Sequence, residues 1–192
     1  MTILVLGLII FLGVHSLRIV ANDWRTAQIA RIGEGPWKGL YSLASVLGLA
    51  LIVWGYGAAR PNSMILWNPP DWTRQLTIVL TLVAFVLVAA AYVPGTRIKA
   101  WLGHPMLAGV KVWALAHLIG NGTLAGVILF GSILVWAIVD FAASRRRDRT
   151  ARVTYPAGTL AGDAIAVFVG AIAWVIFAFF LHEWLIGVRA LG

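Results

Sequence analysis

The stretch HPMLAGVKVWALAHLIGNG, residues 104–122, decides the fold of this chain. Its apolar part, 105–121, is shorter than the roughly 20 residues needed to cross about 30 Å of hydrocarbon. It also carries Lys111 and His117. Asn121 and Gly122 lead directly into another apolar run, which favours a tight helical hairpin. We therefore interpret 105–121 as a membrane-spanning helix.

The composition places the whole chain among polytopic membrane proteins. Of its 192 residues, 61% are hydrophobic and 11% are charged, and the mean hydropathy is +0.90. A soluble domain of this size could not bury so much apolar surface. Further apolar runs lie at 1–21, which we take as a retained helix, 38–59, 74–93, 122–143 and 162–187. Together these runs predict an all-α bundle of six transmembrane helices, forming one domain over residues 1–192.

Basic residues predict the orientation of these helices, because short cytoplasmic loops collect Lys and Arg. The loops after the first, third and fifth helices hold Arg25, Arg31, Lys38, Arg97, Lys99, Arg145, Arg146, Arg147, Arg149 and Arg152. The opposite side holds Arg60, Arg74 and Arg189. If 105–121 were a re-entrant loop, the basic cluster at 145–152 would lie on the opposite side of the membrane from Arg25 and Arg31. The six-helix arrangement is therefore favoured. We therefore expect both termini to be non-cytoplasmic.

The net charge and the absence of cysteine exclude several functions. The charge of +8 is a topology signal and attracts anionic lipid headgroups. It does not indicate nucleic-acid binding, because the run RRRDRTAR at 145–152 is a short loop between predicted spans. The chain has no cysteine, which excludes disulfides, thiolate ligands and covalently attached haem.

His15 lies inside the apolar segment FLGVHSLRIVAN, residues 11–22. An ionisable side chain at bilayer depth is by default a candidate site residue. His15, Arg18 and Asn22 follow at i, i+3 and i+7, which predicts a polar stripe facing the bundle interior. If His15 binds haem iron, Arg18 could pair with a propionate. The alternative is a histidine bonded to a neighbouring helix, with Arg18 extended to the interface.

Trp113, His117 and Asn121 share one face of the fourth predicted helix, which suggests the wall of a pocket. Histidines on two different helices can bind one metal or haem iron between them. The alternative for His117 is a hydrogen bond that bridges two helices. Lys111 lies on another face and could reach the interface, a propionate or Asp140.

Two further histidines are weaker candidates. His104 precedes Pro105, a residue that suits the first helical position, so His104 is expected at a helix start. His182 lies near the end of the last helix, and Glu183 beside it points elsewhere. A zinc site is disfavoured because no dense cluster of histidines and carboxylates is present.

The depths of the two main histidines differ in the predicted helices. His15 is about 9 Å from a helix end at residue 21, and His117 is about 18 Å from a helix start at residue 105. The difference shrinks if the first helix continues through Asn22 to Arg25. We therefore expect that continuation if the two side chains bind one iron.

Three motifs together resemble the NnrU family of membrane proteins over nearly the whole chain. They are HSLR at 15–18, HP at 104–105, and the pattern K-x-WALAHL-x-x-NG at 111–122. The resemblance implies a multi-pass protein of the bacterial inner membrane, linked to nitrite and nitric oxide reductases in denitrifying bacteria. The family is similar to plant zeta-carotene isomerase, a membrane enzyme that holds a non-covalent b-type haem.

The resemblance implies that His15 and His117 are axial ligands of haem b, and it gives no role to His104 or His182. Arg18, Trp113, Asn121 and Lys111 are expected to line the cofactor site. The isomerase motif has a cysteine where this chain has Ala114, which argues against ligand-exchange isomerase chemistry. Whether the protein catalyses an isomerase-like or oxidoreductase-like reaction stays open. The expected partner is a small hydrophobic or nitrogen-oxide ligand.

Two alternative functions come from other classes of protein. The HP motif opening a helix that ends in NG also resembles membrane methyltransferases of the isoprenylcysteine and methanethiol type, which bind S-adenosylmethionine. In those enzymes an arginine precedes HP and a tyrosine follows it, where this chain has Gly103 and Met106. The other alternative is a membrane assembly or regulatory protein without a cofactor.

Overall fold

The computed structural model describes residues 1–190, and its regular structure there is helical, with two isolated β-bridges. The elements are α1 (Thr2–Val20), α2 (Asn22–Ile32), α3 (Glu34–Ala59), η1 (Arg60–Asn62), α4 (Trp72–Tyr92), α5 (Arg97–Leu102), α6 (Pro105–Gly120), α7 (Leu124–Thr150), α8 (Leu160–Ile176), η2 (Phe177–Leu181) and α9 (His182–Ile186). Helices satisfy their own backbone groups, as a segment surrounded by lipid must. The expected all-α fold is confirmed for the described residues.

Within residues 1–190, five helical segments are long and apolar enough to cross a membrane. They are Thr2–Val20, Glu34–Asn62, Trp72–Tyr92, Leu124–Thr150 and Leu160–Ile186. The sixth predicted run forms α6, which has 16 residues and is about 24 Å long at 1.5 Å per residue. Each predicted run is therefore helical, five of them have spanning length, and the crossing of α6 stays a prediction.

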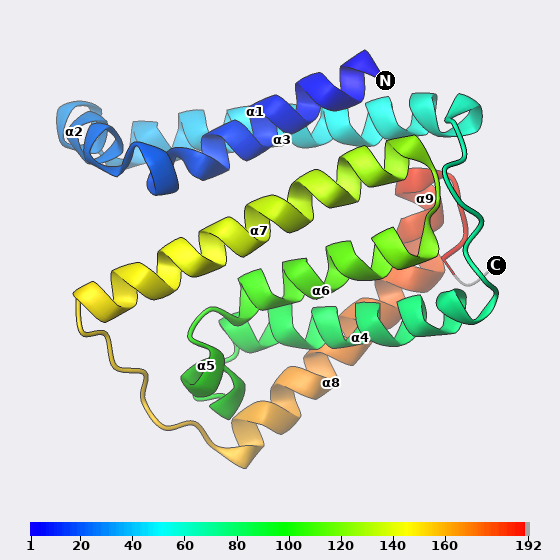
Figure 1. The fold of residues 1–192 in the computed structure, drawn as a ribbon. Coiled ribbons are helices and arrows are strands. Elements are labelled where there is room, and N and C mark those ends of the chain that lie inside the picture. Colours follow the sequence, from blue (N-terminus) through cyan, green and yellow to red (C-terminus); the bar gives the residue numbers. More distant parts are fainter. Residues whose placement is uncertain (191–192) are drawn as a thin grey trace.

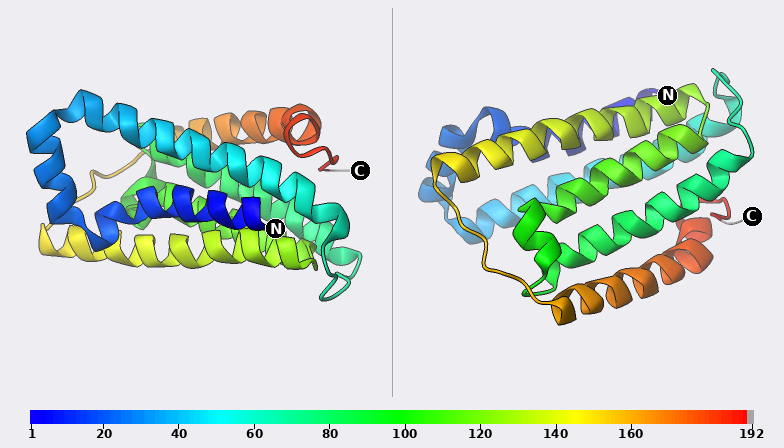
Figure 2. Two further views of the ribbon diagram at one scale, coloured as in Figure 1. Left: turned by 90° about the horizontal axis from the view of Figure 1, so that it is seen from above. Right: turned by 60° about the horizontal axis from the view of Figure 1, so that its bottom comes forward.

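Neighbouring helices contact one another in the order α3, α1, α7, α6, α4 and α8, and α9 returns to contact α3. Figure 2 shows α7, α6, α4 and α8 side by side as one layer. Met1 and α9 lie at one end of the bundle, while α2, α5 and the last turns of α7 lie at the other (Figure 1). We call the latter the basic end, since α2, α5 and α7 each bring arginines to it. Its assignment to the cytoplasm stays a prediction.

Three segments expected to be loops are helical. Residues 22–32 form α2, the loop that carries Arg97 and Lys99 contains α5, and α7 continues through the basic run as far as Thr150. The last turns of α7 are tied together by polar side chains, because Arg147 donates to Ser144 and Ser144 donates to Asp140. The first helix does not continue to Arg25, because the backbone at Ala21 (φ −139°, ψ 41°) leaves the helical region.

Helices α1 and α3 pack with their backbones in contact at three glycines. A Cβ atom added at Gly7 would lie 2.7 Å from the backbone nitrogen of Ile52, and one at Gly48 would lie 2.8 Å from that of Phe11. One added at Gly55 would overlap the backbone of Leu4. Small residues let membrane helices approach this closely. The resulting register of α1 against α3 fixes the position of His15.

We expect Gly55→Ala to destabilise the protein by about 1–3 kcal/mol, the usual range for overpacking, because neither backbone can yield without separating the helices. Gly57→Ala on the same helix is the matched control, since a Cβ at Gly57 would meet no atom within 4 Å. The check is thermal unfolding of both variants in detergent. Equal melting temperatures for the two variants would contradict this account of the α1–α3 contact.

Candidate functional site

A buried apolar cluster joins α1, α3 and α7 and forms the floor of the candidate site. Its members are Leu4, Leu8, Ile52, Tyr56, Ala59, Ala125, Leu129 and Phe130. The imidazole of His117 stacks on the ring of Phe130, with centroids 4.6 Å apart and planes 28° apart. Trp113, one turn earlier on α6, lies 4.8 Å from the same imidazole. The predicted aromatic wall of α6 therefore faces this cluster.

The hydrogen bonding of His117 fixes which ring nitrogen is free. Its Nδ1 lies 2.8 Å from the carbonyl oxygen of Trp113. A carbonyl can only accept, so Nδ1 carries the proton and the neutral ring has its lone pair on Nε2. That Nε2 has no hydrogen-bond partner within residues 1–190. Metal-binding histidines are commonly held in this way.

His15 is held in the same way on α1. Its Nδ1 lies 2.7 Å from the carbonyl oxygen of Phe11. The rings of Phe11, Tyr41 and Trp136 lie 4.2, 5.2 and 5.8 Å from the imidazole. The indole nitrogen of Trp136 is buried and has no partner in the described part of the chain. Buried donors are nearly always paired, so this one marks a place where an added acceptor would be stabilised.

The two histidines lie at different levels along α7. His117 contacts Phe130 and His15 contacts Trp136, and six helical residues correspond to about 9 Å. The expected extension of the first helix does not remove this difference, because α1 ends at Val20. A group bound by both imidazoles would therefore have to bridge two levels of the bundle.

The polar stripe predicted on the first helix does not face inward. Arg18 and Asn22 are exposed, and only His15 of the three is partly buried. Asn22 begins α2 after the break at Ala21, so it no longer follows the face of α1. Contact of Arg18 with a cofactor stays a prediction.

Asn121 has a structural role that its position in the sequence did not reveal. Its Nδ2 donates to the hydroxyl of Tyr56 on α3 at 2.7 Å. Its Oδ1 accepts from the backbone nitrogen and the hydroxyl of Thr123, at 3.1 and 2.7 Å. The side chain thus joins α6, α3 and the start of α7, and its predicted contact with a cofactor stays untested.

Lys111 contacts an aromatic ring, and Asp140, one of the partners considered for it, pairs with another residue. Its ammonium group lies 3.6 Å from the centroid of the Phe141 ring, a favourable cation–π distance. Asp140 pairs instead with Arg147, at 3.6 Å. Contact of Lys111 with a propionate stays a prediction.

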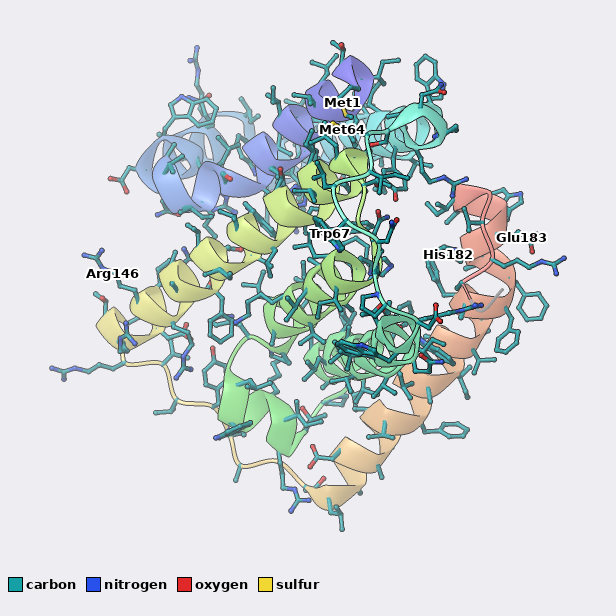
Figure 3. All side chains as sticks on the ribbon, turned by 45° about the vertical axis from the view of Figure 1, so that its right-hand side comes forward. Met1, Met64, Trp67, Arg146, His182 and Glu183 are labelled. Atoms are coloured by element: carbon teal, nitrogen blue, oxygen red, sulfur yellow. The ribbon has the colours of Figure 1, made fainter. Side chains whose placement is uncertain are left out.

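His182, a weaker candidate from the sequence, lies near the site. Figure 3 shows it pointing from α9 toward the bundle interior. Its Nδ1 lies 2.7 Å from the carbonyl oxygen of Val188, and Ile186, one turn later, packs against the buried cluster below His117. The π-helical turn η2 causes this placement, because an inserted residue rotates everything after it by about 100°.

His104 joins a second polar group, at the basic end. It precedes Pro105 at the start of α6, which confirms the expected helix start. Its Nε2 lies 2.8 Å from a carboxylate oxygen of Asp148, and the hydroxyl of Tyr155 donates to that same oxygen at 2.7 Å. We call His104, Asp148 and Tyr155 the clasp, because they fasten the 151–159 connection to α6 and α7.

The clasp predicts a shifted tyrosine titration. Burial and the hydrogen bond to the Asp148 carboxylate raise the pKa of Tyr155 to about 12. Because this folded-state pKa lies above the ordinary value of 10, the stabilisation is complete below pH 10 and is lost as the pH rises through 12. Phenolate absorbance at high pH should lose the contribution of one tyrosine in Tyr155→Phe, and that contribution should move to lower pH in Asp148→Asn. An unchanged titration in Asp148→Asn would contradict the role of the carboxylate.

Comparison with known proteins gives one match. No curated protein and no solved structure matches the chain. A family model described as NnrU protein matches residues 3–190, nearly the whole length. The matched range contains His15, the clasp, the α6–α7 turn and His182. The chain therefore belongs to the NnrU protein family.

Proposed function

We propose that this NnrU-family membrane protein binds one haem b non-covalently, which the imidazoles of His15 and His117 would hold. The proposal rests on a hydrogen-bonding pattern that the two imidazole rings have in common. Each donates its Nδ1 proton to a carbonyl oxygen one turn earlier, at 2.7 Å for His15 and 2.8 Å for His117. Both therefore offer an Nε2 lone pair in a fixed orientation, as an iron ligand must.

The surroundings of the two imidazoles suit a flat apolar group. Aromatic side chains pack on each ring, and the unpaired indole N–H of Trp136 lies beside His15. An acceptor on the bound group would satisfy this donor. When bound, haem supplies a redox-active iron. The chain's contribution is to orient two imidazoles, exclude water and set the polarity around them.

We assign the protein to the bacterial inner membrane and to nitrogen-oxide metabolism, the setting that the family resemblance implies. A cysteine-dependent isomerase reaction is not part of the proposal. Ala114 is fully buried on α6 and has no thiol at the position where the isomerase motif has one. The chain's own residues support binding of the cofactor and leave the identity of any substrate to experiment.

The test is an absorption spectrum of detergent-solubilised protein purified from haem-replete cells. We expect a Soret band and the low-spin spectrum of bis-imidazole iron. A colourless protein that binds S-adenosylmethionine would replace the proposal with the methyltransferase alternative. A colourless protein that binds neither would favour the cofactor-free assembly role.

A further inference from the structure

Two arginines near the end of α7 have no acidic partner. Arg146 and Arg149 are exposed and form no ion pair within residues 1–190. Among the described residues, all acidic side chains at the basic end except Asp23 on α2 already pair with other residues. The pairs are Glu34–Lys38, Asp140–Arg147, Asp148–His104 and Asp163–Arg97. The charge of Arg146 and Arg149 is therefore left for an anion from outside the chain.

Both arginines lie at the depth of lipid headgroups. Helix α7 has 27 residues and is about 40 Å long, whereas the hydrocarbon core is about 30 Å thick. Its charged last turns therefore extend beyond the hydrocarbon. The short helices α2 and α5 at the same end carry Trp24 and Trp101, which are 52% and 83% exposed, and exposed indoles are typical of the headgroup level. The anions that surround Arg146 and Arg149 at this depth are lipid phosphates.

A groove between α1 and α7 leads toward these arginines. It has a volume of about 640 Å³, runs from Leu12 to Val20 on α1 and from Gly131 to Val139 on α7, and has no charged side chain in its lining. Its length on α1 is about 12 Å, which is most of one leaflet of the hydrocarbon core. Arg146 follows Val139 after two helical turns and continues the same face of α7. Figure 3 shows Arg146 on the side of α7 that faces α1 and α2.

We propose that an anionic phospholipid binds where the α1–α7 groove meets the basic end. One acyl chain lies in the groove, and the phosphate pairs with the guanidinium groups of Arg146 and Arg149.

Charge complementarity selects this occupant over the others. Water in the groove would leave the arginines without an anion, and a zwitterionic phospholipid would bring its own cation beside them. A second copy of the chain in the same orientation would place its own arginines next to these, and like charges in an interface are costly. Only a lipid with net negative charge supplies both the apolar chain and the missing anion.

Native mass spectrometry of the full-length protein in detergent, titrated with phosphatidylglycerol or with phosphatidylcholine of the same acyl chains, tests the headgroup contact. We expect one phosphatidylglycerol to bind more tightly than any phosphatidylcholine. Arg146→Gln should weaken its binding about fivefold, and Arg146→Gln/Arg149→Gln about thirtyfold, because each arginine near the surface contributes about equally. Arg74→Gln, at an exposed arginine of the opposite end, should leave the binding unchanged.

A second pair of variants tests the seat of the acyl chain. Gly131 lines the groove, and a Cβ added there would meet no atom within 4 Å. Gly131→Leu should therefore fill the groove and abolish tight binding without disturbing the helix contacts. Gly57→Leu, at an equally open glycine on α3, should bind phosphatidylglycerol as the wild type does.

Four results would overturn the proposal. Equal affinity for phosphatidylcholine would show that the groove takes any phospholipid. Displacement of phosphatidylglycerol by inorganic phosphate at equal concentration would identify a site for a free anion. Unchanged binding in Gly131→Leu would place the acyl chain elsewhere. A dimer that Gly131→Leu dissociates, without bound phosphatidylglycerol in the wild type, would identify the groove as an interface between copies. Haem content does not enter these readouts, so they are independent of the proposed haem site.

Discussion

Protein carrying His117→Ala is expected to lose its Soret band almost completely. His117 stacks on Phe130 at the floor of the site, and its Nε2 is free because its Nδ1 is bonded to Trp113. Alanine removes the imidazole nitrogen that would bind the iron, and its methyl side chain cannot replace that nitrogen. The measurement is the ratio of haem to protein in purified samples, taken from the Soret and protein absorbances.

The controls separate loss of the ligand from loss of the fold. Glu183→Ala removes an exposed side chain paired with Arg189 and should leave the haem content unchanged. His15→Ala should reduce the haem content and convert what remains from low spin to high spin. If His15→Ala stays low spin while His182→Ala becomes high spin, the second ligand is His182, whose ring also reaches the neighbourhood of His117. Wild-type haem content in His117→Ala would refute the haem proposal.

Substitution of Gly122 by alanine is expected to give the largest loss of stability of any single methyl addition considered. A Cβ at this position would overlap the backbone carbonyl of Trp67. The same glycine accepts two hydrogen bonds, from the backbone nitrogens of Leu66 at 2.7 Å and Trp67 at 3.2 Å. Leu124 also donates to the carbonyl oxygen of Met64, at 2.9 Å. We call this contact between residues 64–67 and 122–124 the junction. The long connection after α3 is thus fastened to the α6–α7 turn by these backbone contacts and by the hydrogen bond from the Ala125 N–H to the hydroxyl of Ser63, at 2.9 Å.

The size of the effect follows from those contacts. Relief of the overlap requires the junction to open, and each lost backbone hydrogen bond costs about 1 kcal/mol in addition to the strain. We therefore expect destabilisation of at least about 3 kcal/mol, seen as an earlier thermal transition in detergent. Gly131→Ala on α7 is the control and should be neutral or slightly stabilising, because its Cβ would be free of contacts. A Gly122→Ala variant that melts like wild type would show that the junction is not rigid.

Local features of the sequence predicted most of the helices and part of the site. Six apolar runs became helices because length and hydropathy act within each segment. His104 was placed at a helix start because the fixed φ of Pro105 suits that position. Trp113 and His117 were placed on one face of α6 because their spacing of four residues matches the helical period. The family resemblance on three short motifs was confirmed over residues 3–190.

Contacts between distant residues could not be predicted from those patterns. Asn121 was expected to line a pocket, and the sequence gave no sign that its Nδ2 donates a hydrogen bond to the hydroxyl of Tyr56, 65 positions earlier. His182 was expected near the end of the last helix without a role, and the π-helical turn before it directs it inward. The inward stripe on α1 was wrong because a backbone break at Ala21 separates Asn22 from the helix that carries His15 and Arg18.

The sequence alone determined that this chain is an apolar helical bundle, because burial in lipid depends on the composition of each segment and hydrogen bonding within each helix. Only the tertiary structure decided which imidazoles lie near one another and where, among residues 1–190, a buried indole N–H lacks a partner. Those outcomes depend on the rotation and register of one helix against another. A glycine contact between α1 and α3, or one inserted residue before α9, sets that register. The sequence shows neither which backbone the glycines meet nor where the extra residue is inserted.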